Sequence, residues 1–417
     1  MLHKIKRLLK DRRGNALVIA GAALPLVVGS AGLATDTIQW VTWKRQLQRA
    51  ADSAAFAGVY ALSQSSSADT AVATDLVNNQ HAPVTLRTGY PQIAYPTSTT
   101  YDNAVQVTLS IQKRLGFSSM FLSAAPIITV NATAAMVDDG EYCLRGLRRD
   151  AVAAIQVGGS SSASLGCKAM SNSRGNPSVV VNGNSYRFET TGVAGAATLP
   201  PEITGTATAD LDPYHMPMPD PFEGKYPTSV PSGTSCTNFN QHQSNVGTGQ
   251  NRTYRLSPGC YNDFKITGSE TYALDPGVYY LNATDFEISG SATLTGTGVT
   301  IILTGSTPGS VQTNGNANIN LTAPTTGTYA KMLFIQAAGA TVENNNTING
   351  SSTSSYDGAF YFPKGNVNFN GSSGNMTKCA MVVAYTVIFN GNTNLQNNVT
   401  GCSANMTVKG KEIRLVA

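Results

Sequence analysis

Short segments in the C-terminal half of the chain recur at a nearly constant spacing. FKITGSETYAL, residues 264–274, returns as FEISGSATLTG, residues 286–296, and SPGCY returns as DPGVY. An apolar residue followed by Asn-Gly also occurs three times, beginning at Ile348, Phe369 and Phe389. A period of about 20 residues is typical of a solenoid, because each repeat makes one coil and buries its apolar face on the next. The sequence therefore predicts a parallel β-helix (β-solenoid).

The composition of this region agrees with a stack of short strands. Apolar runs such as VTIIL and AMVVAYTVIF alternate with Asn, Gly, Ser and Thr. Disordered chains are typically charged or Pro-rich and poor in β-branched residues, so these runs indicate burial. Asn-Gly suits the corners because both residues accept a positive φ. Only five charged residues lie between Ile288 and Val408: Lys331, Glu343, Asp357, Lys364 and Lys378.

Six cysteines indicate disulfides in an oxidising compartment. No CxxC or Cys/His cluster suggests zinc, and no cofactor is expected. Residues one coil apart stack at about 4.8 Å, which lies within the range of Cα separations for a disulfide. Six cysteines allow many connectivities, so sequential pairing is a hypothesis. The pairs are Cys143–Cys167, Cys236–Cys260 and Cys379–Cys402.

The N-terminal segment predicts a membrane span. No charged residue lies between Gly14 and Thr35, and a helix of this length reaches about 33 Å, enough to cross a hydrocarbon core. A cleaved signal peptide is the alternative, because Val28-Gly29-Ser30 has the small residues of a cleavage site. The sequence continues to Leu62 in helix-compatible residues, which favours an anchor that the mature protein keeps.

Basic residues predict the orientation of this span. More basic residues precede the span than follow it, so the positive-inside rule places the N-terminus in the cytoplasm and the bulk of the chain in the periplasm. The first 13 residues have a formal charge of +5, and the whole chain has +4, so the remaining residues sum to −1. The rest of the chain therefore lacks the excess of basic residues that binding to nucleic acid requires. The six before the span are Lys4, Lys6, Arg7, Lys10, Arg12 and Arg13, and the three after it are Lys44, Arg45 and Arg49.

Two further features of this segment predict contacts. Trp40 and Trp43 follow the apolar core, where interfacial aromatic anchors belong. Gly21, Pro25 and Gly29 recur every four residues and form a small-residue face on which another membrane helix can pack. The alternative is that these three residues only soften the helix.

The N-terminal segment resembles that of TadG-like proteins of the Tad (Flp) pilus-assembly system. The matching features are Arg13-Gly14-Asn15, Leu24-Pro25, Gly32-Leu33-Ala34-Thr35-Asp36, Trp40 and the stretch from Leu47 to Ala55. The resemblance implies a retained, single-pass anchor in the bacterial inner membrane. Related pseudopilins carry Glu five residues after a processed Gly, and here that residue is Ile19. This departure argues against cutting by a prepilin peptidase.

The expected fold is mainly β with an N-terminal α-helix. Residues 1–62 form a basic stub, transmembrane anchor and stalk helix, and residues 63–137 form a small α+β region. Residues 138–199 are expected to be irregular first coils of the solenoid, and residues 236–417 its regular part. Residues 200–235 are an excursion or linker, because eight of the 19 prolines lie between Pro200 and Pro231.

No pattern in the sequence predicts catalysis or metal binding. Glycoside hydrolysis needs two carboxyl groups held close together, but the acids near the best coils, Asp263, Asp275, Asp285 and Glu287, have the context of solvated corners. Asp212, His215, Asp220 and Glu223 lie among prolines, which favours a rigid loop over a cation site. The chain is therefore not expected to be an enzyme or to take a small-molecule substrate.

The function expected from these features is structural. The chain would act in Tad (Flp) pilus assembly or envelope attachment, through contacts with other pilus-assembly proteins in the inner membrane and periplasm. The alternative is a secreted or cell-surface β-solenoid adhesin, or a carbohydrate-binding or degenerate carbohydrate-active protein. Retention or cleavage of the N-terminus distinguishes the two.

Overall fold

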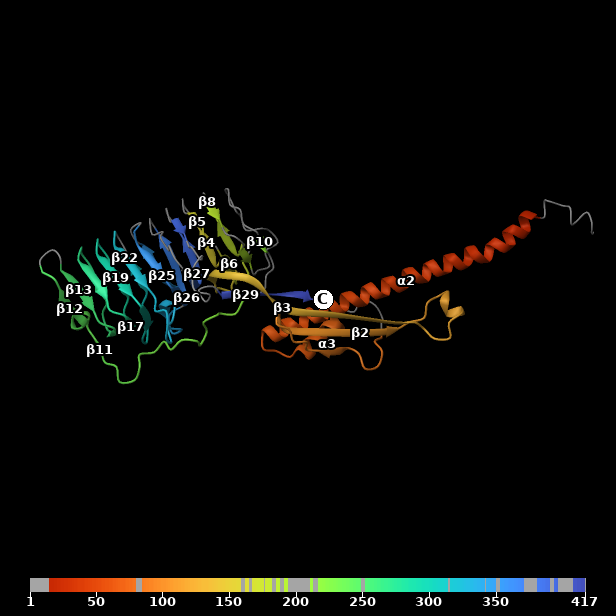
Figure 1. Cartoon of the computed structure of the whole chain (residues 1–417), viewed down its shortest axis with the longest axis horizontal. Helices are drawn as coiled ribbons and strands as arrows, with labels where there is room; N and C mark the ends of the chain where they lie inside the picture. The colour runs from red at the N-terminus through yellow and green to blue at the C-terminus, as the bar shows by residue number, and fades with distance from the viewer. Residues whose placement is uncertain are drawn as a thin grey trace, which may run out of the picture. The chain divides into compact units, whose positions relative to one another are not determined.

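The chain forms two compact units, Met1–Asp138 with Lys411–Ala417 and Asp139–Gly410 (Figure 1). The boundary between them falls within the strand β3 (Ile127–Gly146). The computed structural model describes residues 15–79, 85–158, 162–164, 167–175, 177–181, 185–187, 191–193, 211–212, 217–248, 252–313, 316–341, 343–349, 353–370, 381–390, 394–396 and 408–416.

The first unit is built on one long helix, α2 (Asn15–Ser63). Its C-terminal part carries small and apolar residues at three- and four-residue steps, so one face can approach other elements closely. That face packs on the helix α3 (Ala68–Asn79) and on a sheet. The buried helix residues are Leu47, Ala51, Ala54, Ala55 and Val59.

An antiparallel sheet completes this core. The strand β1 (Gln92–Ala94) pairs with β2 (Asp102–Gln112), which pairs with β3. The residues of β2 that pack on this core alternate, as expected for a strand with one face on it. They are Val105, Val107, Leu109 and Ile111, and Ala104 and Ser110 of the same strand are buried as well. The expected stalk helix and the α+β region after it therefore share a single core.

The C-terminal end of the chain belongs to this first unit. The last described strand is β29 (Val408–Val416), and Lys411 forms ion pairs of 2.6 Å with Asp102 and 2.7 Å with Asp138. Ile413 packs against the helix–sheet core. The prediction that the solenoid extends to residue 417 is therefore wrong for Lys411–Ala417, which belong to the first unit.

The second unit is the predicted parallel β-solenoid, and its coils present three faces. The first face stacks β11 (Cys236–Thr237), β14 (Gly259–Tyr261), β17 (Gly277–Asn282), β20 (Val299–Thr304), β23 (Met332–Gln336), β26 (Ala359–Asn370), β27 (Met381–Phe389), β3, β6 (Lys168–Ser171), β9 (Thr191–Val193) and β10 (Leu211–Asp212).

The second face stacks β15 (Lys265–Ile266), β18 (Phe286–Ile288), β21 (Val311–Thr313), β24 (Asn344–Asn349), β26, β27, β4 (Ile155–Val157) and β7 (Val179–Val181). The third face stacks β12 (Gln243–Val246), β13 (Thr253–Leu256), β16 (Thr271–Leu274), β19 (Thr293–Thr297), β22 (Asn318–Thr322) and β25 (Ser355–Asp357), with a separate group of β28 (Asn394–Gln396), β5 (Ser162–Ser164) and β8 (Ser185–Arg187). A short 3₁₀ helix, η2 (Phe239–His242), precedes β12 in the solenoid. Another, η1 (Ser118–Met120), belongs to the first unit, between β2 and β3.

The coils do not stack in the order of the sequence. The late strand β27 lies between β26 and the early strands β3 and β4, with Val382 opposite Leu144 and Phe389 opposite Val157. The early coils therefore continue the stack beyond its C-terminal coil. A connection must consequently return along the solenoid from β10 to β11, and the Pro-rich segment provides it.

Residues 217–231 of this connection are named the strap, and they pack on the first face of the solenoid (Figure 1). Phe222 contacts Tyr361 with ring centroids 5.3 Å apart, and Tyr226 stacks on Tyr329 at 6.3 Å. Both rings join an apolar cluster with side chains of β17, β20, β23 and β26. This cover explains why β20 and β23 are buried at every position, one set of side chains facing the core and the other the strap. The strap, which lies within the predicted excursion or linker, is thus packed on the solenoid.

The inward ladder that the Asn-Gly repeats predict is confirmed. Ile348 lies opposite Phe369, and Phe369 opposite Phe389. Each is only 1% exposed. The rings of Phe369 and Phe389 stack with centroids 5.2 Å apart.

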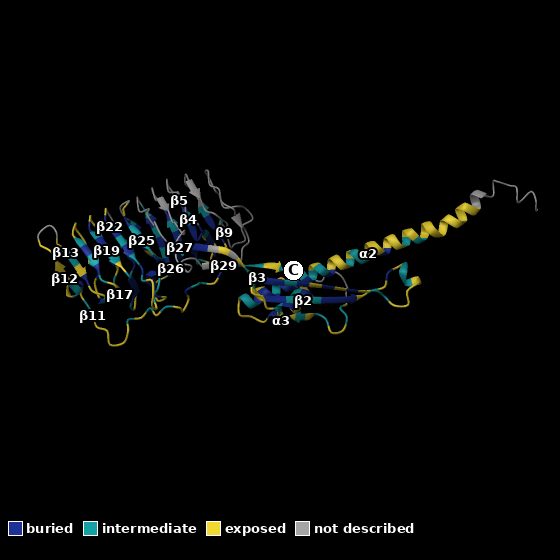
Figure 2. Cartoon of the chain, viewed as in Figure 1, coloured by how far each residue is buried: buried dark blue, intermediate teal, exposed yellow. Residues whose placement is uncertain are grey.

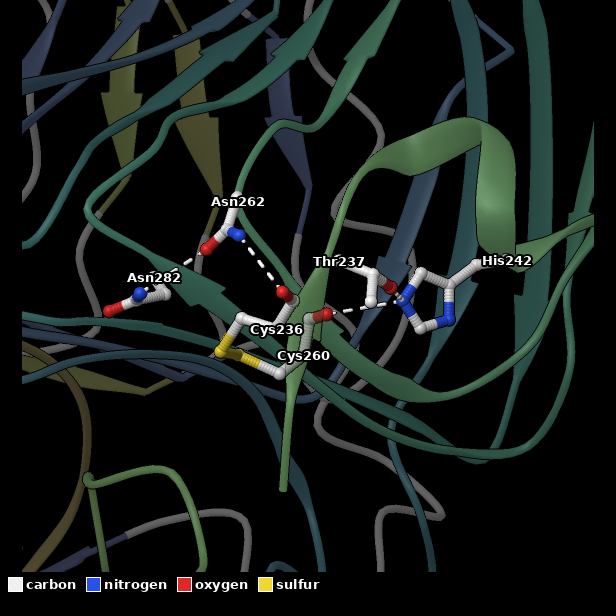
Figure 3. Close-up of a disulfide and its surroundings, with 6 residues drawn as sticks. All are labelled: Cys236, Thr237, His242, Cys260, Asn262 and Asn282. Atoms are coloured by element: carbon white, nitrogen blue, oxygen red, sulfur yellow. Dashed lines mark hydrogen bonds between the residues drawn. A yellow bond between two sulfur atoms is a disulfide. The ribbon is translucent and has the colours of Figure 1, made fainter. Parts of the chain in front are cut away.

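Two of the three predicted disulfides are present, and each joins neighbouring coils. Cys143–Cys167 has a Cα separation of 5.9 Å and Cys236–Cys260 one of 4.4 Å. Around the latter (Figure 3), the Asn262 side chain donates to the Cys236 carbonyl at 2.9 Å, and the His242 Nε2 atom lies 3.1 Å from the Cys260 carbonyl oxygen. The disulfide therefore links the end coil, which contains β11, to the next coil, and side-chain hydrogen bonds stabilise the same contact. Cys379 and Cys402 lie outside the described residues.

We expect alkylation of denatured, non-reduced protein from the cell envelope to modify no cysteine. The reason is that all six are proposed to be paired between coils, including Cys379–Cys402. Mass spectrometry of the alkylated protein measures this, and the reduced protein, in which all six should react, is the control. Modification of two or more cysteines without reduction would contradict the third pair.

Candidate functional site

The N-terminal part of α2 leaves its apolar side chains uncovered. Leu24, Leu26 and Val27 are 65%, 76% and 63% exposed, and Figure 2 shows this part of the helix in the colour of exposed residues. From Val18 onward the helix is long and apolar enough to cross a membrane. Large exposed apolar surfaces mark contacts with membranes or other proteins. This part of α2 is therefore compatible with membrane anchoring.

The small residues of the predicted packing face lie on this exposed part. The helix runs through Pro25 without a break. A Cβ atom added to Gly21 or Gly29 would meet no described atom within 4 Å. The surface there has room for a close neighbour, and the packing of a second membrane helix on it stays a prediction.

Asp36 is the first charged residue after the uncharged stretch, yet it is only 3% exposed. Its carboxylate accepts hydrogen bonds from the backbone N–H of Phe117, at 2.9 Å, and from the backbone N–H and the hydroxyl of Ser118. Ser118 begins η1, whose first N–H groups have no partner within the helix. Asp36 therefore fixes the loop between β2 and β3, residues 113–126, to the side of α2.

Gly32 lies one turn before Asp36 on the same face of the helix and receives the ring of Phe117. A Cβ atom at Gly32 would overlap the Phe117 Cγ and Cδ2 atoms, so only glycine lets the ring lie there. Gly32 and Asp36 thus form a two-point attachment for the β2–β3 loop. Both residues belong to the Gly-Leu-Ala-Thr-Asp motif, whose letters alone do not indicate this role. The four-residue spacing, which aligns side chains on one helix face, was the available signal.

Trp40 and Trp43 are half-buried against the core of helix and sheet. The Lys113 Nζ atom lies 4.6 Å from the centroid of the Trp43 ring, and the Lys44 Nζ atom lies 5.4 Å from that of Trp40. Cation–π attraction favours both arrangements. Because Lys113 starts the β2–β3 loop, Trp43 is a third contact for it. Contact of either tryptophan with a membrane interface stays a prediction.

The four acids of the regular coils each have a partner in a neighbouring coil. The Phe239 N–H donates to Asp263 at 2.5 Å, and the backbone N–H of Ser310 donates to Asp285 at 2.7 Å. Two ion pairs complete the set, Arg255–Asp275 and Lys265–Glu287, the latter at 2.7 Å. These carboxylates therefore link neighbouring coils, and Asp263 and Asp285 are exposed, as expected for solvated corners.

No group of three or more His, Cys, Asp or Glu side chains suited to a metal ion occurs among the residues that the structure describes. Of the four Pro-rich candidates, His215 and the side chain of Asp212 lie outside that set. Asp220 belongs to the strap. Its carboxylate accepts hydrogen bonds from the Phe222 N–H at 2.9 Å and from the Tyr361 hydroxyl at 2.8 Å.

Neither a curated protein nor a solved structure matches the chain. A family model does match at the N-terminus: residues 14–64 fit the Tad model, described as putative Flp pilus-assembly TadE/G-like. The match includes the exposed apolar part of α2, Gly32 and Asp36, and the face that packs on α3. Residues 14–64 are therefore a TadE/G-like segment of putative Flp pilus assembly, as the resemblance predicts, and they point to a pilus-related structural role.

Proposed function

We propose that the protein is a single-pass inner-membrane component of Tad (Flp) pilus assembly or envelope attachment, with a cytoplasmic N-terminus and a periplasmic solenoid. One observation carries the proposal. The TadE/G-like segment runs as a single helix from an exposed apolar span into the core of a folded unit. The helix continues unbroken past the small residues at which a signal peptide would be cut. Anchor and folded unit are thus one element.

Other features support the proposed compartment and mode of action. Disulfides between coils suit an oxidising compartment such as the periplasm. The excess of basic residues before the span favours a cytoplasmic N-terminus. Stacked coils provide an extended surface of the kind that repeat proteins use to bind other proteins. We propose other proteins of the pilus-assembly apparatus as its partners.

The proposal assigns no catalytic step to the solenoid. The carboxylates of Asp263, Asp275, Asp285 and Glu287 are engaged in bonds between coils. Their removal should weaken neighbouring coils and leave no chemical function to lose. No cofactor or small-molecule substrate is proposed.

We expect the mature protein to retain residues 12–36 and to stay in the inner-membrane fraction after alkaline extraction. Mass spectrometry of its N-terminal peptide and fractionation measure this. Protease added to spheroplasts should digest the chain beyond Asp36 and spare an N-terminal tag, which becomes accessible only after lysis. A mature N-terminus near Ala31 with release of the protein would contradict the proposal and support the adhesin alternative.

A further inference from the structure

Three large apolar side chains form the tip of the β2–β3 loop, and more than half of each is exposed. Met120, Phe121 and Leu122 are 76%, 74% and 53% exposed. The backbone of the tip is nevertheless ordered by hydrogen bonds, since the N–H groups of Phe121 and Leu122 donate to the Ser118 carbonyl at 3.0 and 2.8 Å. The loop therefore holds these side chains outward in a fixed turn. Such exposure is costly in water and indicates a contact surface.

The attachment of the loop to α2 sets the level at which this tip lies. Phe117 packs on Gly32, and the ring of Phe121 lies 5.3 Å from that of Phe117. Thr35 is the last residue of the uncharged stretch. At a rise of about 1.5 Å per residue, Gly32 lies roughly 4.5 Å inside the end of that stretch. The apolar tip is thus beside the last turn of the proposed span.

The charged residues at the start of the loop lie further along α2 than the tip, because Lys113 contacts Trp43, eight residues past Thr35. Lys113 and Arg114, at its start, are the only charged residues between Asn103 and Val137. Basic side chains close to a membrane surface are attracted to anionic headgroups. The one acid nearby, Asp36, is covered by the loop itself. A segment that has apolar residues at its tip and basic residues at its start is typical of one that lies in a membrane interface.

We infer that Met120-Phe121-Leu122 inserts into the boundary between headgroups and acyl chains of the periplasmic leaflet, beside α2. The occupant of this surface is therefore lipid. Together with α2 the loop gives the first unit a second contact with the bilayer, and Asp36 and Gly32 hold the two contacts together. This inference rests on the proposed anchoring of α2 in the membrane.

Photocrosslinking in intact membranes tests the inference on the full chain. A benzophenone amino acid replaces Phe121, an aromatic residue that is 74% exposed, so the replacement is expected to leave the fold intact. The same probe at Leu26, 76% exposed in the apolar span, is the positive control, and at Val77, 80% exposed on α3, the negative control. The α3 residue Asp75 bonds to Ser53, which lies well beyond Asp36 on α2. At about 1.5 Å per residue this places the negative control roughly 25 Å further along the helix.

We expect lipid adducts from the probes at Leu26 and Phe121 in comparable yield, at least about tenfold above the yield at Val77. Lipid adducts at Leu26 alone would overturn the inference and leave the anchor in place. Adducts of Phe121 with a protein instead of lipid would overturn it too, and would make the tip a docking surface for that protein. Absence of lipid adducts at both positions would contradict the membrane anchor itself.

Discussion

Replacing Phe369 with alanine is expected to lower the free energy of unfolding of the solenoid by about 3–5 kcal/mol, the usual cost of deleting a fully buried phenylalanine side chain. Phe369 is 1% exposed and lies between Ile348 and Phe389 in the inward ladder. Its ring also meets Phe360 at 6.3 Å. The substitution would leave a cavity. The side chains around it are held in register by the strands of neighbouring coils, so they cannot fill it without breaking hydrogen bonds between those strands.

Denaturant unfolding of the full chain in detergent measures the effect. Phe121→Ala is the matched control, because that side chain is 74% exposed and lies outside the solenoid. It should change the stability of the solenoid by no more than about 0.5 kcal/mol. Hydrogen exchange should show that the loss in Phe369→Ala is greatest in β24, β26 and β27, since each coil of a solenoid is stabilised by its neighbours. A cost below about 1 kcal/mol would show that Phe369 does not occupy a packed inward position.

The parts of the fold that repeat were predictable from the sequence, because each coil repeats the same local chemistry. The Phe-x-Ile repeat places Ile266 opposite Ile288, and the Asn-Gly repeats give the ladder through Ile348. Two of the predicted disulfides follow from the same period. The repeat of SPGCY as DPGVY was a poorer guide, since aligning the two segments would place Tyr261 opposite Tyr279.

Strands β14 and β17 instead pair Gly259 with Tyr279. Just before the two segments, however, Leu256 of β13 does pair with Leu274 of β16, as the alignment predicts. Two extra residues therefore enter the second coil at this corner. Each tyrosine still donates its hydroxyl hydrogen to the carbonyl four residues earlier, Ser257 or Asp275. The repeated letters thus encode a repeated local turn, and the register depends on how much chain lies between the turns.

Contacts between distant parts of the sequence left no periodic signal. Nothing in the repeats indicates that β27 pairs with β3, because parallel pairing joins any two coils of similar shape. The attachment of the β2–β3 loop to α2 depends on Asp36 and Ser118, which lie 82 residues apart. A carboxylate in a helix gives no sign of which N–H groups it will accept from. Such pairings needed the structure.

The strap depends on contacts of this distant kind, and Arg145 is central to them. The Arg145 side chain is 3% exposed, and its Nη1 atom donates to the Pro219 carbonyl at 2.9 Å. Asn172 accepts from the Met218 N–H at 2.9 Å and donates to its carbonyl at 2.7 Å. Burial lowers the pKa of Arg145 to about 10, while the charge of Asp220 acts to raise it. Burial likewise raises the pKa of Asp220. One end of the strap is therefore fixed by polar groups that have little access to water.

Arg145→Ala is expected to free this end of the strap. The substitution removes the hydrogen bond from the charged Arg145 side chain to the Pro219 carbonyl, which contributes roughly 1.5–3 kcal/mol, and adds a cavity beneath Met218. Protection of the Met218 amide from hydrogen exchange should fall about tenfold to a hundredfold, since each 1.4 kcal/mol is about a factor of ten. Arg255→Ala is the matched control, because Arg255 is half exposed and pairs with Asp275 at the surface. Surface pairs contribute about 1 kcal/mol or less, so strap protection should stay unchanged there.

The two variants together separate local from global effects. If Arg145 holds the strap, its loss should uncover Phe222 and Tyr226 as well, because both pack only while the segment lies along the first face. The outward side chains of β20 and β23, Ile302 and Ile335, would then meet water, and the solenoid would expose an apolar stripe that favours aggregation. Unchanged exchange throughout residues 217–231 in Arg145→Ala would contradict this. The aromatic contacts with Tyr361 and Tyr329 would then suffice to hold the strap.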